Sequence, residues 1–104
     1  MENYRSITKL SDLQAYLAGQ PVVAFDFETA PNDPYRDEAR AAIDSHKAHI
    51  TGVSFSVAEG DAVYVPVAHK VGENIENADV LWAWLKEHLY ESKSVVKVAH
   101  NLSF

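Results

Sequence analysis

Residues 21–28, which read PVVAFDFE, constrain the fold of this chain more than any other segment. The run is apolar on both faces at its start and rich in valine and phenylalanine, which is typical of a strand inside a sheet. Strand alternation places Asp26 and Glu28 on one face, about 7 Å apart, and the two phenylalanines on the other. Because Val22 and Ala24 precede the carboxylates on their face, we expect a central strand that is covered at its start and opens to solvent only at its carboxyl end.

Turn and cap residues divide the rest of the chain into short elements. The predicted elements are a helix over 11–19, a helix over 33–47, a β-hairpin with strands 50–57 and 62–67, a helix over 77–91 and a strand over 94–99. Ser11 and Gly19 are residue types that begin and end helices, as expected for the helix over 11–19. Asn77 or Asp79 is expected to cap the helix over 77–91. Pro66 has no amide hydrogen, so the second hairpin strand is expected to end there or to lie at an edge.

These elements predict an α/β domain with a mixed sheet, made of a three-stranded antiparallel meander and a further parallel strand, with flanking helices. A helix joins the hairpin to the last predicted strand, residues 94–99. Because such crossovers are right-handed, they place this strand beside the first predicted strand, residues 21–28, and parallel to it. The carboxyl ends of the two strands are then adjacent, one carrying Asp26 and Glu28 and the other His100 and Asn101. Open α/β sheets bind ligands at this edge, so we expect the functional site there.

Composition narrows the class of protein. The 104 residues suffice for one domain, and the absence of cysteine excludes disulfides, thiolate zinc sites and cysteine nucleophiles. The formal net charge of −6 argues against nucleic-acid binding through a broad basic face, but metal ions held by carboxylates can still bind phosphate. No apolar run approaches the roughly 20 residues of a membrane span and the first residues do not form a signal peptide, so we expect a cytoplasmic protein.

The two strand-end carboxylates are the candidate metal ligands. Like charges on one half-buried strand face repel each other unless a cation offsets them. Asp26 and Glu28 offer hard oxygen ligands, which favour Mg²⁺ or Mn²⁺. The Asp-x-Glu pattern by itself is short, and it is more often two solvated side chains at the end of a strand. Asn101 is also typical of a helix N-cap and His100 of a polar strand end.

Three segments together resemble the proofreading 3′-5′ exonuclease domain of the DNA polymerase I family, and the resemblance spans residues 21–104. The matching residues are Asp26, Glu28 and Thr29 after a hydrophobic strand, then Gly52-Val53-Ser54-Phe55, then the return strand 62–69, AVYVPVAH, and finally Asn101-Leu102-Ser103-Phe104. The return strand discriminates best, because ribonuclease D-like relatives share the acidic motif but tend to lack its Tyr-x-Pro pattern.

The resemblance implies a ribonuclease-H-like fold and metal-dependent hydrolysis of phosphodiesters at single-stranded DNA 3′ ends. Two Mg²⁺ or Mn²⁺ ions would orient and deprotonate a water and stabilise the charge on the attacked phosphodiester. Asp26 would bridge the ions and Glu28 would ligate one of them. The implied substrate-binding residues are Thr29, His100, Asn101 and Phe104.

The last residue, Phe104, stands one position before the place where the family carries its next catalytic aspartate. Residues 1–104 are therefore expected to form a partial exonuclease domain that ends just before the second acidic motif is complete, is inactive alone and self-associates. A downstream polymerase domain is the implied partner in the intact protein. Two alternatives stay open: a ribonuclease D-like exonuclease that trims RNA 3′ ends, and a non-catalytic exonuclease-like module with a structural or nucleic-acid-docking role.

Overall fold

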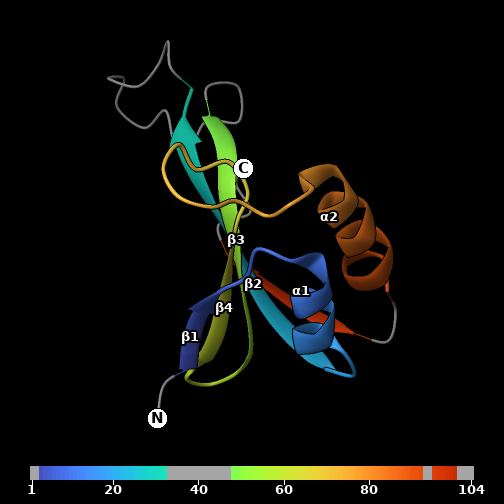
Figure 1. The fold of residues 1–104 in the computed structure, drawn as a ribbon. Coiled ribbons are helices and arrows are strands. Elements are labelled where there is room, and N and C mark those ends of the chain that lie inside the picture. The colour runs from blue at the N-terminus through green and yellow to red at the C-terminus, as the bar shows by residue number, and fades with distance from the viewer. Residues whose placement is uncertain (1–2, 33–47, 93–94, 101–104) are drawn as a thin grey trace.

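A single mixed sheet forms the centre of the molecule in the computed structural model, which describes residues 3–32, 48–92 and 95–100 (Figure 1). The sheet has five strands in the order β1-β4-β3-β2-β5. Their bounds are β1 Asn3–Ser6, β2 Val22–Pro31, β3 Ala48–Ala58, β4 Asp61–Pro66 and β5 Val96–His100. The predicted helix over 33–47 lies outside the described residues.

The strand pairing confirms the predicted meander and crossover. β2 pairs with β3 and β3 with β4 in antiparallel fashion, and β5 lies parallel to β2 on its other side. β1 was not predicted, because a segment of four residues, of which asparagine, arginine and serine are polar, carries little strand signal. It lies parallel to β4 at the opposite edge of the sheet, so Pro66 ends an interior strand rather than an edge strand.

Two helical segments pack on one face of this sheet (Figure 1). They are α1, Leu10–Leu17, and α2, Ala78–Leu85, which continues as the π-helical turn η3, Lys86–Tyr90. Asn77 caps α2 as predicted, since its side-chain oxygen accepts a hydrogen bond from the Val80 amide at 3.3 Å. The predicted Ser11 cap of α1 is wrong. The helix begins one residue earlier, so extended Lys9 occupies the cap position and Ser11 lies exposed in the first turn.

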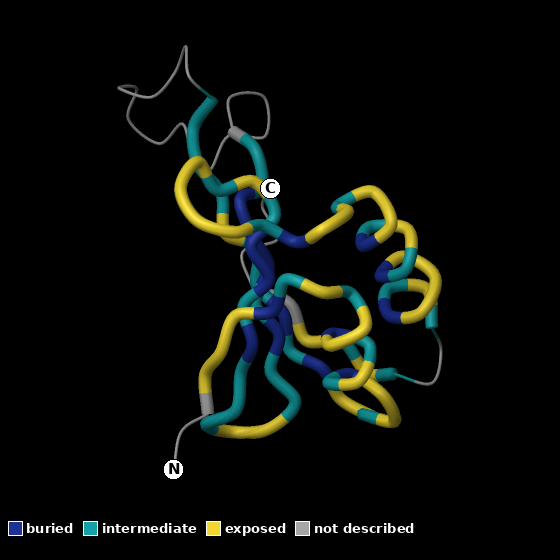
Figure 2. Tube along the Cα trace, viewed as in Figure 1, coloured by how far each residue is buried: buried dark blue, intermediate teal, exposed yellow. Residues whose placement is uncertain are grey.

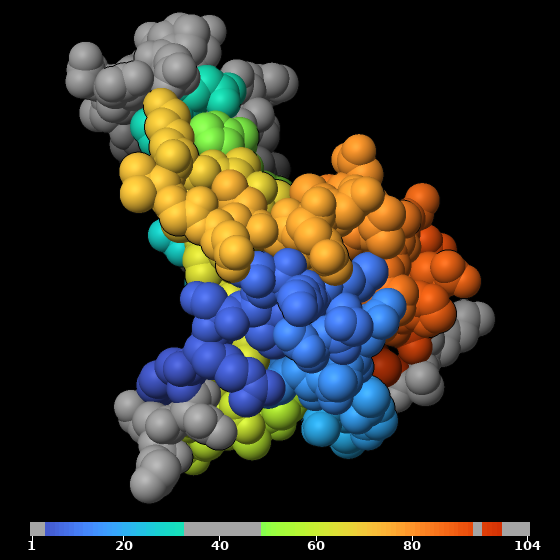
Figure 3. Space-filling view, viewed as in Figure 1, coloured from blue at the N-terminus to red at the C-terminus, as the bar shows by residue number. Residues whose placement is uncertain are grey.

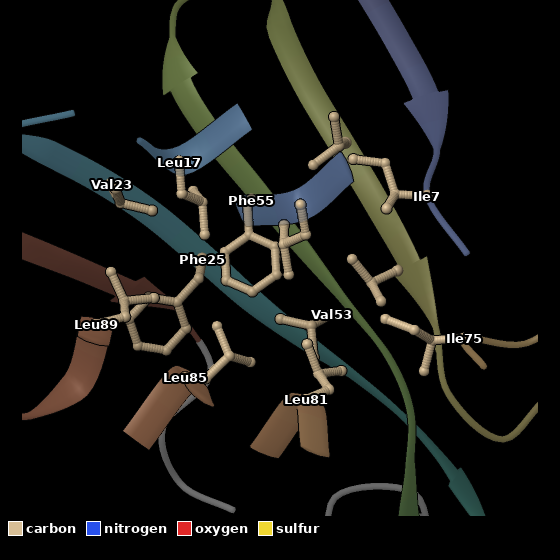
Figure 4. Close-up of a cluster of buried hydrophobic side chains, with 13 residues drawn as sticks. Ile7, Leu17, Val23, Phe25, Val53, Phe55, Ile75, Leu81, Leu85 and Leu89 are labelled. Atoms are coloured by element: carbon tan, nitrogen blue, oxygen red, sulfur yellow. The ribbon is translucent and has the colours of Figure 1, made fainter. Parts of the chain in front are cut away.

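The core fills the space between the sheet and these helices (Figures 2 and 4). Its members are Ile7, Leu13, Leu17, Val23, Phe25, Val53, Phe55, Val63, Val65, Ile75, Leu81, Leu85 and Leu89. Phe55 on β3 lies at its centre and is almost fully buried. Alternation on β2 sends Val23 and Phe25 to this side, which leaves Asp26 and Glu28 on the other.

No described helix or strand covers the second face of the sheet. We expected the start of β2 to be covered on this face, and the structure corrects that expectation, because Val22 is 46% exposed. The neighbouring valines of β5, Val96 and Val98, are 60% and 44% exposed. Both helices pack against the Val23 side, so no described helix covers the carboxylate side.

This apolar face adjoins the edge strand β5, and we expect it to drive self-association at high concentration. Replacing Val96 by lysine and Val98 by threonine is expected to shift sedimentation velocity profiles at about millimolar chain concentration toward the monomer. The matched control is Val80→Lys on α2, which changes an equally exposed valine on the opposite layer. A wild-type chain that stays monomeric at every concentration would contradict the expectation.

Candidate active site

Asp26 occupies the middle of the open face. It pairs with Ser54 of β3 on one side and, as predicted from the parallel crossover, with His100 of β5 on the other. The hydroxyl of Ser54 donates a long hydrogen bond of 3.4 Å to the Asp26 carbonyl, and Asp26 itself is half-buried. Two more predicted site residues, Asn101 and Phe104, lie outside the described residues. The β2–β5 register thus places one carboxylate and one histidine at adjacent positions on neighbouring strands.

Glu28 lies two residues further along β2, on the same face as Asp26 and nearer the carboxyl end of the strand. It pairs with Gly52 and is exposed. Two carboxylates on one uncovered face offer hard oxygen donors, which suit Mg²⁺ or Mn²⁺. The described residues contain no cluster of three or more acidic or histidine side chains suited to a metal ion. They therefore fit part of a coordination shell, with water completing it.

A β-bulge follows Glu28 directly. The register moves from Glu28 opposite Gly52 to Thr29 opposite Ile50, so Thr51 is an extra residue in β3. Thr51 is only 8% exposed, and its hydroxyl donates to the Glu28 carbonyl at 3.1 Å. The bulge thereby fixes the backbone on which the second carboxylate stands. It also places Thr29 opposite a residue that packs on the core.

The same bulge holds the segment that follows β4. The Thr51 carbonyl accepts hydrogen bonds from the amides of Val67 at 2.8 Å and Ala68 at 3.0 Å. The segment beyond, drawn in gold in Figure 3, then crosses the surface toward α2 and is tied by the Glu76 amide to the Thr8 carbonyl at 3.1 Å. His69 therefore enters a loop that is anchored at both ends.

Tyr64 of β4 is the functional candidate that our reading of the sequence missed. Its hydroxyl lies directly over the backbone of Gly52 and 2.5 Å from Nε2 of His69. Burial, followed by a hydrogen bond to Glu28 and the charge of that carboxylate, raises the pKa of Tyr64 to about 12. The signal in the sequence was the Tyr-x-Pro-x-x-His spacing, which identified the family pattern without suggesting a role for the phenol.

Comparisons with known proteins identify the family of this chain. A family profile described as 3′-5′ exonuclease matches residues 1–104. The chain belongs to this 3′-5′ exonuclease family. It is 39% identical to DNA polymerase I of Pseudomonas aeruginosa over 86 residues, which is 80% of this chain and 8% of that protein. The chain thus spans a small part of the length of this relative.

Solved structures show the fold of this exonuclease-family chain. The Aedes aegypti Nibbler EXO domain superposes with a TM-score of 0.61 at 13% identity, covering 93% of this chain and 38% of that one. NrnC of Brucella melitensis superposes with a TM-score of 0.47 at 20% identity, covering 96% of this chain and 38% of that one. The first superposition and the mixed five-stranded sheet confirm the predicted α/β fold of the ribonuclease-H-like exonuclease type.

Two hollows in the described part of the chain lie apart from the carboxylate pair. A cavity of about 600 Å³ between α1 and η3 is lined by neither Asp26 nor Glu28, so it is separate from the candidate chemistry. A second hollow, of about 390 Å³, is lined by both Tyr64 and His69 and by neither carboxylate of β2. No helix among the described residues is long and apolar enough to cross a membrane.

Proposed function

We propose that this chain contributes the first acidic motif of a metal-dependent 3′-5′ exonuclease that hydrolyses phosphodiesters at single-stranded DNA 3′ ends. One observation carries the proposal: Asp26 and Glu28 share the uncovered face of the central strand, and His100 of the parallel strand is paired with Asp26. Family membership supports the reaction class, and the DNA polymerase I relative supports DNA as substrate and a polymerase domain as partner.

In this proposal the position of each residue on the sheet decides whether it binds metal or positions the substrate. Divalent metal ions, when bound, would supply the activated water and the positive charge that a phosphodiester needs in hydrolysis. Asp26 at the sheet centre would be the ligand shared by the ions, and Glu28 at the strand end beside the bulge would hold one of them. His100 stands next to Asp26 on β5 to position the terminal nucleotide. The remaining proposed substrate contacts are Thr29, Asn101 and Phe104.

The sugar preference decides between this proposal and RNA trimming. A labelled single-stranded DNA and an RNA of the same sequence are offered to the intact protein in one assay. Preference for DNA 3′ ends supports proofreading-type activity, and preference for RNA favours a ribonuclease D-like enzyme. Absence of turnover on both, in the presence of Mg²⁺ or Mn²⁺, favours a docking module instead.

The metal site is tested on the chain itself. Substoichiometric Mn²⁺ is expected to broaden the backbone amide NMR signals near residues 26–28, because a paramagnetic ion held by both carboxylates relaxes nearby nuclei. Asp26→Ala is expected to abolish this broadening, whereas Asp12→Ala, which removes an exposed carboxylate from α1 on the opposite layer, is expected to leave it unchanged. Equal broadening in the wild-type chain and Asp26→Ala would overturn the proposed site.

A further inference from the structure

We propose that Tyr64 is a positioning residue for Glu28, whose carboxylate it holds by a hydrogen bond from its phenolic hydroxyl, and that His69 in turn orients Tyr64. The inference rests on the proposed function in taking Glu28 as a metal ligand. It also assigns a role to the Tyr-x-Pro-x-x-His pattern, which the proposed function leaves unused.

The strand register brings Tyr64 to Glu28. Glu28 pairs with Gly52, and Gly52 pairs with Pro66, so these three positions form one row across β2, β3 and β4. Tyr64 stands two residues before Pro66 and therefore on the same face of the sheet. Its side chain leans along the strand into this row, where the hydroxyl and two ring carbons occupy the space that a side chain on Gly52 would need.

Gly52 makes this close approach feasible. Any β-carbon at this position would collide with the phenol, so only glycine lets the side chain of Tyr64 lie over the β3 backbone. The collision would be with the hydroxyl and two carbons of the outer half of the ring. A glycine in the middle of an interior strand weakens that strand, and accommodation of Tyr64 is the physical reason for it here.

The electrostatics of Tyr64 agree with a donor role. The pKa of the phenol is raised to about 12, first by burial and then by a hydrogen bond to Glu28 and the charge of that carboxylate. A phenol carries one hydrogen that it can donate, and a carboxylate oxygen is an acceptor.

His69 completes the chain of hydrogen bonds. A phenol has one hydrogen, so a hydroxyl that donates to Glu28 can only accept from Nε2 of His69, 2.5 Å away. The imidazole must then carry its proton on Nε2. Asn74 holds the histidine backbone from both sides, because it accepts from the His69 amide at 2.8 Å and donates to the His69 carbonyl at 3.0 Å. The anchored loop thereby orients the phenol through the hydrogen bond from His69.

The consequence is a preorganised ligand. Glu28 is exposed and has rotatable side-chain bonds, so unaided it would sample many rotamers and lose this freedom when a metal ion binds. A hydrogen bond to a ligating carboxylate restricts that sampling, and removal of such partners typically costs about 10- to 100-fold in metal affinity. Tyr64 would act through Glu28 without contacting the reacting atoms.

Tyr64→Phe tests the inference, because it removes the hydroxyl and keeps the ring over Gly52. In the metal-free chain we expect the side-chain carboxyl ¹³C signal of Glu28, assigned with Glu28→Gln, to move away from its wild-type position. Mn²⁺ affinity, followed by amide broadening, is expected to fall about tenfold while broadening near Asp26 remains at saturating ion. The matched control is Tyr16→Phe, which removes a hydroxyl bonded to the Asp61 carbonyl at 3.1 Å, at the far end of β4.

Two more variants keep the test decisive. His69→Gln retains a side-chain donor and is expected to preserve the Glu28 signal, whereas His69→Leu is expected to shift it as Tyr64→Phe does. In the wild-type chain, ¹⁵N spectra of His69 should show the proton on Nε2. A Glu28 signal and an Mn²⁺ affinity that are both unchanged in a folded Tyr64→Phe chain would overturn the inference. Absence of Mn²⁺ binding in the wild-type chain would overturn the proposed function, and the metal-free Glu28 signal would still decide whether Tyr64 holds that side chain.

Discussion

Replacing Asp26 by alanine is expected to lower metal-dependent removal of 3′ nucleotides by at least about a hundredfold. Displacing reacting groups by about 1 Å can already cost on the order of 100-fold, and loss of the metal ligand that we propose at Asp26 displaces more than that. Asp26 is also the more enclosed of the two carboxylates, because it is half-buried between β3 and β5 whereas Glu28 is exposed. Glu28→Ala is expected to have a comparable effect from the strand end.

The assay compares chains of two lengths on a labelled single-stranded DNA, with Mg²⁺ and with a chelator. The 104-residue chain is expected to be inactive, because the described residues place no cluster of three or more acidic or histidine side chains around the two carboxylates of β2, and two carboxylates alone cannot align a water and support a leaving oxygen. A chain that adds the later acidic motifs of the exonuclease family is expected to be active and to lose activity with Asp26→Ala. The control is Asp12→Ala on α1, which should keep full activity.

One result would contradict this account of the site. Robust activity in the 104-residue chain that disappears with Asp26→Ala would mean that a second copy of the chain supplies further ligands. Mixing an Asp26→Ala chain with a Glu28→Ala chain would then restore part of the activity, whereas our account predicts that the mixture is as inactive as either variant alone.

Phe55→Ala is expected to lower the free energy of unfolding by about 3–5 kcal/mol. Phe55 lies at the centre of the core, is almost fully buried and pairs across the sheet with Phe25 (Figure 4). Domains of this size are stable by only about 5–15 kcal/mol, so the variant forfeits a large part of its stability. The corresponding fall in melting temperature is at least about 12 °C.

Urea unfolding followed by far-UV circular dichroism measures this change. Tyr4→Ala is the matched control, because it truncates an aromatic residue that is 63% exposed on β1, and we expect it to change stability by less than about 0.5 kcal/mol. A loss below about 1 kcal/mol for Phe55→Ala would show that the helices do not pack around this ring. Since the core lies on the face opposite Asp26, Phe55→Ala does not touch the carboxylates directly.

Several features of the fold and site could be predicted because they depend on neighbours in the sequence. The run of valine and phenylalanine in β2 predicts a strand, and its period of two puts Asp26 and Glu28 on one face whatever the rest of the chain does. The Asn77 cap depends on an amide three residues away. The parallel pairing of β5 with β2 followed from the single handedness of crossovers, which leaves few topologies to consider.

Other features were decided by contacts between segments far apart in the chain, and local sequence patterns do not report such contacts. Which face of β2 is covered depended on where both helices pack, and they left Val22 exposed. The bulge at Thr51 arises from two strands of unequal local length, and neither strand shows it alone. The approach of Tyr64 to Glu28 depends on three strands in register and a missing side chain on the middle one. The sequence by itself therefore determined that Asp26 and Glu28 share one face, through alternation within one strand. Only the tertiary structure decided what surrounds them, because packing and register couple residues that lie far apart in the chain.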